Sequence, residues 1–232
     1  MIVRHFLKVG LVAAILPVAP AFAAKPSFDC AGAKSLAERT ICANEALARD
    51  DMKITELYRA IGKALDQTAG EAFVNDQKYF IQVRDAWAES ETDTDKRIKR
   101  LQALFTDRIH FLRAIDTASS DNMTGDWRNT KGTITVERSP DGTLKAIVKA
   151  ADPVRGSWVC QAEGNGKPAG NVLSFKVKDT EESEAIALTK IGPILGVDAT
   201  GNRGQIQQGG SYCGLNGSVT GWYFKVRDGA VP

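Results

Sequence analysis

Histidine is nearly absent from this 232-residue chain, which has only His5 and His110. His5 lies in an N-terminal segment with the features of an export signal, so the exported chain would keep His110 alone. Metal sites built from several histidines are therefore excluded, and any Ser-His-Asp hydrolase would have to act through His110. As a general base His110 would need a nucleophile and an orienting group beside it in the fold. We interpret it as a partly buried or surface residue of a helix.

An excess of either charge is also lacking. Lys and Arg number 30 against 28 Asp and Glu, so the net charge gives no reason to expect a nucleic acid or an anionic membrane as partner. No apolar run reaches the roughly 18 residues of a transmembrane helix. With 43% hydrophobic and 25% charged residues, the chain is globular and long enough for one large or two modest cores.

The N-terminus has the pattern of a signal peptide over residues 1–23. A basic stretch precedes an apolar run from Val9 to Leu16, and the small residues Ala21 and Ala23 fit an A-x-A cleavage site. We expect a mature chain that starts at Ala24 and is periplasmic or secreted. No cysteine lies at the cleavage point, so we expect no membrane anchor after cleavage; the alternative is an uncleaved N-terminal anchor.

The rest of the chain divides by composition into two halves. Proline is absent between Ser27 and Ser139, whereas 17 of the 21 glycines lie from Met123 onward. A polar stretch between the halves is typical of a linker. We therefore predict a helical domain at 24–116, a linker at 117–122 and a β-domain at 123–232.

Helical periodicity and capping residues define the first domain. Ser35 with Glu38 forms a capping box, and Asn44 can cap the next helix. Further helices are expected at 71–89 and after the Thr92–Asp95 break. Together these segments predict a small antiparallel helical bundle.

Short alternating segments separated by turns define the second domain. Leu173, Phe175 and Val177 alternate with polar residues, as in an antiparallel strand with one buried face. The fold class is thus α+β in two segregated domains, with an all-β antiparallel barrel or sandwich at the C-terminus. The strands are expected near 133–137, 143–149, 156–162, 171–178, 184–189, 193–198 and 218–226.

The four cysteines all follow the expected cleavage site. In an oxidising compartment they favour two disulfides, with three possible pairings. The composition boundary favours pairing within each domain, Cys30 with Cys42 and Cys160 with Cys213. A zinc site is the alternative, but no pair has C-x-x-C spacing and His110 is distant in sequence, so we expect no metal and no cofactor.

The first domain resembles the LprI-type lysozyme-inhibitor family, a group of exported helical modules. The resemblance covers about residues 28–113. It rests on Phe28-Asp29-Cys30, the ERTIC segment Glu38–Cys42, Leu57-Tyr58-Arg59, Gln77, Arg84-Asp85, Arg108, Ile109 and Leu112. It implies binding to a bacterial-cell-wall lysozyme and blockage of its cleft.

Two features depart from this family. Members commonly carry a second cysteine pair that joins the last two helices, but here Trp87 and Arg100 stand about where those cysteines would fall. Phe80 replaces the usual tryptophan of the third helix. The β-domain is not recognised; its Tyr212-Cys213-Gly214 segment offers only a weak analogy to barrel-shaped exported lysozyme inhibitors.

Two glycine-rich segments carry the candidate contacts with such a partner. Residues 164–170 and 201–204 place Lys167 and Arg203 on expected loop tips. Lysozymes cut glycans with paired carboxylates, to which an inhibitor could present a basic side chain. The alternative is that both are plain solvent-exposed hairpin loops.

Acidic side chains are the remaining candidates for chemistry. Glu38, Asp50 and Asp51 could form a glycosidase-type pair, but they also fit helix caps and first-turn charges. We interpret the run Glu181, Glu182 and Glu184 as a solvated loop.

Aromatic residues of the β-domain are most simply core. They are Trp127, Trp158, Trp222 and Tyr223, and the alternative is the lining of a ligand cavity. In a ligand-free barrel we expect Leu173, Phe175, Trp222 and Phe224 to fill the interior.

These observations favour a non-enzymatic exported protein that binds lysozyme-like muramidases or another cell-envelope protein. One alternative is a carrier whose β-domain encloses a small ligand or glycan. The other is an envelope hydrolase, which would need a cleft with a carboxylate of raised pKa.

Mass spectrometry of the unreduced exported protein tests the disulfide prediction. We expect no free thiols and the two links 30–42 and 160–213. A link that crosses residue 120 would contradict the two-domain boundary.

Overall fold

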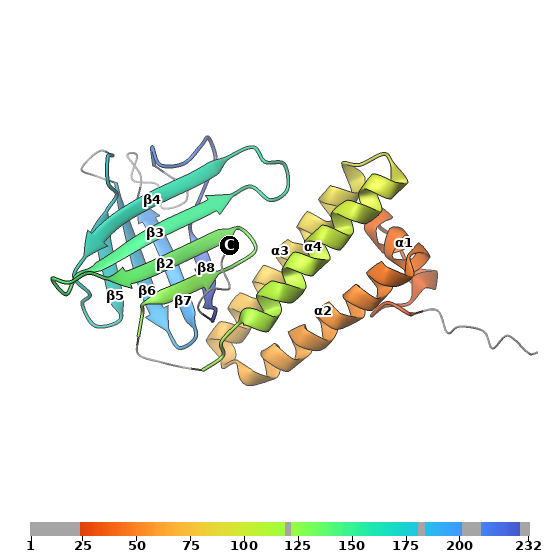
Figure 1. Ribbon diagram of the computed structural model, residues 1–232, viewed down its shortest axis with the longest axis horizontal. Coiled ribbons are helices and arrows are strands. Elements are labelled where there is room, and N and C mark those ends of the chain that lie inside the picture. Colours follow the sequence, from red (N-terminus) through yellow and green to blue (C-terminus); the bar gives the residue numbers. More distant parts are fainter. Residues whose placement is uncertain (1–23, 119–121, 181–183, 201–209, 228–232) are drawn as a thin grey trace, which may run out of the picture.

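The computed structural model describes residues 24–118, 122–180, 184–200 and 210–227. The expected signal peptide therefore lies outside the described residues. A helical bundle lies beside a β-barrel (Figure 1), which confirms the α+β fold class in two domains. The helices are η1 (Cys30–Gly32), α1 (Leu36–Ala43), α2 (Glu45–Ala64), α3 (Gln67–Glu89) and α4 (Thr94–Ala114).

Each long helix begins at a side-chain cap. Ser35 and Glu38 form the expected capping box of α1, and Asn44 accepts a hydrogen bond from the Leu47 amide at the start of α2. Helix α3 begins before the predicted residue 71, because the Asp66 side chain accepts from the Ala69 amide and caps it there. Asp93 caps α4 in the same way.

The β-domain is an eight-stranded antiparallel barrel, which settles the choice between barrel and sandwich. Strands that are neighbours in sequence pair in the sheet, except β4 and β5, which form its two edges, and β8 pairs with β1. The sequence missed β1, whose four residues are too few for an alternation pattern. The strands are β1 (Gly125–Arg128), β2 (Gly132–Arg138), β3 (Leu144–Ala151), β4 (Val159–Gly166), β5 (Val172–Lys176), β6 (Ala185–Ile191), β7 (Ile194–Thr200) and β8 (Gly221–Lys225).

Glycines in β4 allow the barrel to come near to closing between β4 and β5. A Cβ on Gly164 would lie 2.4 Å from the Lys176 carbonyl oxygen, and one on Gly166 would lie 2.4 Å from that of Ser174. A backbone hydrogen bond of 2.8 Å from Lys178 to Glu163 joins the two strands. The expected glycine loop 164–170 is therefore partly strand, since Gly164 and Gly166 are needed for this close approach.

Strand β8 separates the two hydrophobic cores. Tyr223 points into the barrel, where it is fully buried with Trp127. Phe224 and Trp222 point the other way, toward the helices. Leu173 and Phe175 fill the interior as predicted, but the prediction that Trp222 and Phe224 do so is wrong, because alternation along β8 directs both to the outer face.

The outer face of the barrel is thus part of the core of the bundle. The Phe224 ring centroid lies 5.5 Å from that of Phe73 on α3 and 6.4 Å from that of Phe111 on α4. Ile194 and Val226 are fully buried in the same cluster. Such an apolar interface makes the two domains one packed unit.

Backbone hydrogen bonds extend this contact beyond the end of α4. Ile115 forms a β-bridge with Val226, and the Asp116 amide donates to the Lys225 carbonyl over 2.9 Å. The Arg227 amide in turn donates to the Ala114 carbonyl over 3.0 Å. The segment after α4 is therefore held against the last strand.

Within the described residues, no helix combines the length and apolarity that a membrane span requires.

Phe224→Ala tests the shared core. Loss of the ring leaves a cavity between the two domains, and we expect the free energy of unfolding to fall by about 3–5 kcal/mol. Leu215→Ala is the control, because that side chain is 86% exposed and should change stability by less than about 0.5 kcal/mol. Denaturant unfolding followed by tryptophan fluorescence and circular dichroism measures both. Equal stability of the two variants would contradict a shared core.

Candidate functional site

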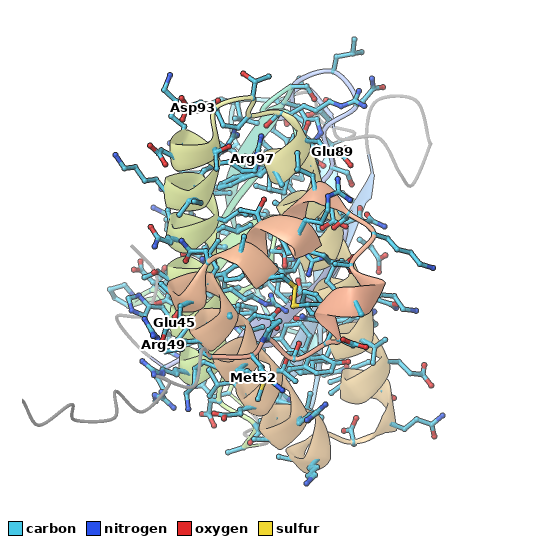
Figure 2. All side chains as sticks on the ribbon, turned by 90° about the vertical axis from the view of Figure 1, so that its right-hand side faces the viewer. Glu45, Arg49, Met52, Glu89, Asp93 and Arg97 are labelled. Carbon is cyan, nitrogen blue, oxygen red and sulfur yellow. A yellow bond between two sulfur atoms is a disulfide. The ribbon has the colours of Figure 1, made fainter. Side chains whose placement is uncertain are left out.

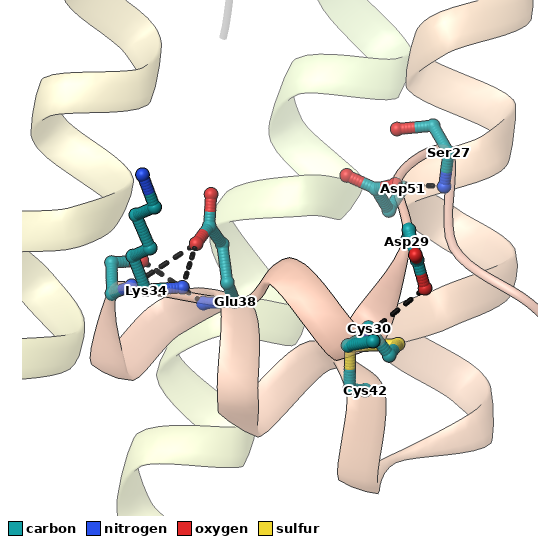
Figure 3. Close-up of a disulfide and its surroundings, with 9 residues drawn as sticks. Ser27, Asp29, Cys30, Lys34, Glu38, Cys42 and Asp51 are labelled. Carbon is teal, nitrogen blue, oxygen red and sulfur yellow. Dashed lines mark hydrogen bonds between the residues drawn. A yellow bond between two sulfur atoms is a disulfide. The ribbon is translucent and has the colours of Figure 1, made fainter.

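The first disulfide joins η1 to the end of α1. Cys30 and Cys42 are bonded, with Cα atoms 5.8 Å apart (Figure 3). Asp29 caps η1 by accepting from the Ala31 amide over 3.0 Å. This bond secures the short N-terminal part of the domain against the longer helices.

The acidic residues near this disulfide are engaged in the backbone. The Glu38 carboxylate accepts from the Ser35 and Lys34 amides, and these bonds lower its pKa. Asp51 accepts from the Ser27 amide over 2.7 Å (Figure 3). Partial burial raises the pKa of Asp50. Glu38 and Asp51 thus have the structural roles of helix capping and chain fixation, and His110 is exposed on α4.

Glu184 differs from the prediction. Residues 181 and 182 lie outside the described residues, but Glu184 is 1% exposed instead of solvated. Its carboxylate accepts from the Ser211 amide over 2.8 Å and from the Ser211 hydroxyl over 3.0 Å. A buried carboxylate with two donors is a structural anchor for the segment that begins at residue 210.

A buried ion pair joins the bundle to the barrel. Arg108 on α4 donates to Asp76 on α3 over 2.6 Å, and their side chains are 2% and 7% exposed. Asp76 also accepts from the Thr130 amide in the β1–β2 turn over 2.8 Å, and Arg108 donates to Gln77 over 2.7 Å. The guanidinium lies 4.8 Å from the Phe80 ring centroid. Three residues that carry the family resemblance or its departures, Gln77, Phe80 and Arg108, thus meet here.

A cation–π pair occupies the place where the family's second cysteine pair is expected. The Arg100 guanidinium lies 4.6 Å from the centroid of the Trp87 ring. The Trp87 indole nitrogen donates to the Pro153 carbonyl of the β3–β4 connection. Helices α3 and α4 are therefore linked here by a weaker contact, and one member of it also holds the barrel.

The turn between α3 and α4 is closed by Arg97. Its guanidinium donates to the carbonyls of Ala88, Glu91 and Thr92 over 2.7–3.3 Å. Figure 2 shows Arg97 between Glu89 and Asp93, at the end of the bundle away from Glu45, Arg49 and Met52 of α2. Arg97 thereby satisfies one carbonyl in the last turn of α3, that of Ala88, and two carbonyls of the turn that follows.

A pocket of about 410 Å³ lies beside the ion pair, between α3 and the barrel. Tyr79, Asn129, Lys131 and Trp222 contribute to its lining. Burial lowers the pKa of Lys131, whose ammonium donates to the Thr220 carbonyl over 2.7 Å. Burial also raises the pKa of Tyr79. These polar groups lie at the interface between the bundle and the barrel, whereas apolar side chains fill the interior of the barrel.

Lys167 lies at one end of the barrel, here called end A, which holds the β2–β3, β4–β5 and β6–β7 connections. Its side chain is exposed. A pocket of about 440 Å³ opens at this end, lined in part by Arg138 and Lys190. The Lys190 ammonium donates to the Gly192 carbonyl over 2.9 Å, so it closes its own hairpin.

Arg203 lies outside the described residues, but the strands that flank it are described. β7 ends at Thr200 and β8 begins at Gly221, both at the opposite end of the barrel, here called end B. The connections at the two ends alternate along an up-and-down barrel. The two candidate contacts were grouped together from the sequence. The strands that flank Lys167 meet end A, whereas those that flank Arg203 meet end B.

The second disulfide lies at end B. Cys160 and Cys213 are bonded, and they also form a β-bridge. Val159 beside it is 69% exposed and Leu215 is 86% exposed. Neither residue was identified from the sequence, because a single exposed apolar residue at the end of a strand or in a loop carries no periodic signal. Trp158 is half-buried at this end and packs against the barrel core, whereas Trp127 is fully buried within it.

No group of three or more histidine, cysteine or acidic side chains suited to a metal ion occurs among the described residues.

Asp76→Asn tests the buried ion pair. The amide leaves the Arg108 guanidinium buried without its counter-charge, and we expect a loss of about 3–5 kcal/mol in the free energy of unfolding. Arg49→Ala is the matched control, because the Arg49–Glu45 pair is 58% exposed on both sides and should matter by less than about 1 kcal/mol. Chemical denaturation compares the two, and similar losses would contradict the structural role of the cluster.

Comparison with known proteins gave a match for the helical part of the chain. No significant match was found among curated proteins or among solved structures. The family match covers less than half of the chain and includes all the helices. The resemblance expected from the sequence motifs is confirmed for this segment: residues 30–121 match the family described as Lysozyme inhibitor LprI.

Proposed function

We propose that this protein is an exported, non-enzymatic inhibitor of lysozyme-like muramidases that acts by occluding their glycan cleft. The observation that carries the proposal is the match of residues 30–121 to the lysozyme-inhibitor family. Inhibition in this sense needs a stable surface of complementary shape, with no bond made or broken by the inhibitor.

Three features of the chain support this proposal. Both domains hold a disulfide, which suits an oxidising compartment outside the cytoplasm. Glu38, Asp51 and Glu184 are engaged with backbone amides, so their carboxylates serve structure. The barrel interior is occupied by its own side chains, including Trp127 and Tyr223, which favours a binding surface over a carrier cavity.

The domains would act as one binding unit. The shared core at Phe224 and the ion pair at Asp76 fix the barrel on the bundle. A rigid two-domain body loses little conformational entropy on association. Lys167 lies at end A, whereas β7 ends and β8 begins at end B. A single cleft would therefore accommodate one end of the barrel.

Inhibition assays with the full chain, purified after export, test the proposal. We expect inhibition of at least one class among chicken-type, goose-type and invertebrate-type lysozymes, with saturable heat in calorimetric titration. Occlusion of the cleft predicts a raised apparent KM for a soluble oligosaccharide substrate with unchanged kcat. Disulfide-reduced, unfolded protein serves as the control.

Absence of both heat and inhibition with all three classes would contradict the proposed function. Inhibition that lowers kcat at constant KM would retain an inhibitor but contradict occlusion of the cleft.

A further inference from the structure

A short loop at end B is anchored to the barrel at its start and carries an exposed apolar residue at its tip. We call residues 210–218 the Leu215 loop. It lies beside β4, at the end of the barrel that also holds the β3–β4 connection (Figure 1).

The loop is anchored to β4 by covalent and hydrogen bonds. The Cys160–Cys213 disulfide joins it to the strand. The Gln161 amide donates to the Tyr212 carbonyl over 2.9 Å, and the Gly214 amide donates to the Val159 carbonyl over 2.8 Å. The loop therefore continues the sheet at this edge.

A second anchor ties the start of the loop to β6. Glu184 accepts two hydrogen bonds from Ser211 and is 1% exposed. A Cβ on Gly210 would lie 2.5 Å from the Glu184 side chain, so glycine permits this close approach. Both strands β4 and β6 thus hold the same loop.

The tip itself is a tight turn. The Gly217 amide donates to the Gly214 carbonyl over 2.8 Å, and Asn216 adopts φ 64° in the left-handed region. A Cβ on Gly217 would lie 3.0 Å from the Cys160 sulfur, so the turn packs directly on the disulfide. These contacts fix the backbone on either side of Leu215 and leave its side chain in solvent.

Apolar side chains next to the start of β4 flank the Leu215 loop. Val159 is 69% exposed, and Trp158 is half-buried and contacts the loop at Gly214. Arg155, in the same β3–β4 connection as Trp158, has an exposed side chain. Exposed apolar residues on a rigid loop are typical of recognition surfaces, because little entropy is lost when they are buried by a partner.

We infer that the Leu215 loop is the element that enters the partner's glycan cleft, with Leu215 and Val159 against the sugar-binding walls and Arg155 toward its carboxylates. This inference rests on the proposed function. A protruding apolar tip requires a concave partner, and a muramidase cleft that cuts glycans with paired carboxylates supplies both the concavity and the opposite charge.

Charge and apolar variants of the loop test the inference with a lysozyme that the full chain inhibits. Leu215→Asp places a charge on a surface that the cleft must desolvate, and we expect a rise in Kd of about 30-fold or more. Val159→Asp should act in the same direction. Arg155→Glu should weaken binding by about 10-fold, with the greatest effect at low salt.

Ile191→Asp is the matched control at end A, and Lys167→Glu tests the competing candidate contact at the same end. Ile191 is 38% exposed and apolar, and Lys167 is exposed and basic, so the same chemical changes are made at the other end of the barrel. Both should leave Kd within about threefold. Circular dichroism and thermal unfolding should be unchanged in all variants because each side chain is exposed.

The outcomes separate this inference from the proposed function. Loss of affinity at Leu215 and Val159 with the end A variants unchanged supports the loop as the inhibitory element. Loss at Lys167 with Leu215→Asp unchanged overturns the inference and leaves the inhibitor intact. Failure of the unaltered chain to inhibit any lysozyme overturns the proposed function itself.

Discussion

The Arg108 guanidinium is the group on which the arrangement of the two domains depends. It is buried between α3, α4 and the β1–β2 turn, and its charge is balanced by Asp76. Phe80 and Phe111 lie against it at 4.8 and 5.1 Å. Displacement of the barrel would remove the Thr130 amide from Asp76 and the Thr130 hydroxyl from Arg108, and a buried charge loses stabilisation when its hydrogen-bond partners are removed.

One contact within the helical domain also holds the barrel. The resemblance to the LprI-type family implies a disulfide between the last two helices, whereas Trp87 and Arg100 stack at that position here. The Trp87 indole nitrogen also donates to the carbonyl of Pro153 on the barrel. Trp87 therefore contacts both domains. The β-domain, for its part, covers apolar surface of α3 and α4 that would otherwise face water.

Much of the fold could be predicted from local signals. Ser35 with Glu38, and Asn44, mark helix starts because a cap is a contact between near neighbours in sequence. Alternation at Leu173 and Phe175 marks a strand for the same reason. The role of Phe224 could not be found in this way, since alternation shows that one face of β8 is buried but not what covers the other.

Less of the candidate site than of the fold could be predicted from the sequence. Lys167 and Arg203 were paired because both lie in glycine-rich segments, yet Gly164 and Gly166 serve the closure between β4 and β5. Glu184 was placed in solvent because its neighbours are acidic, although Ser211, far along the chain, satisfies it. Leu215 carries no pattern at all. Its exposure depends on a disulfide and a turn that only the folded chain brings together.

The pairing of β8 with β1 also sets the order in which the molecule can be completed. The helices are synthesised first, but Phe224 and Val226, which cover them, follow α4 by more than 100 residues in the sequence. Until β8 is synthesised, Phe73 and Phe111 have no cover on that side. A chain that stops before Gly221 would therefore lose both strand β8 and the residues that cover the helical core.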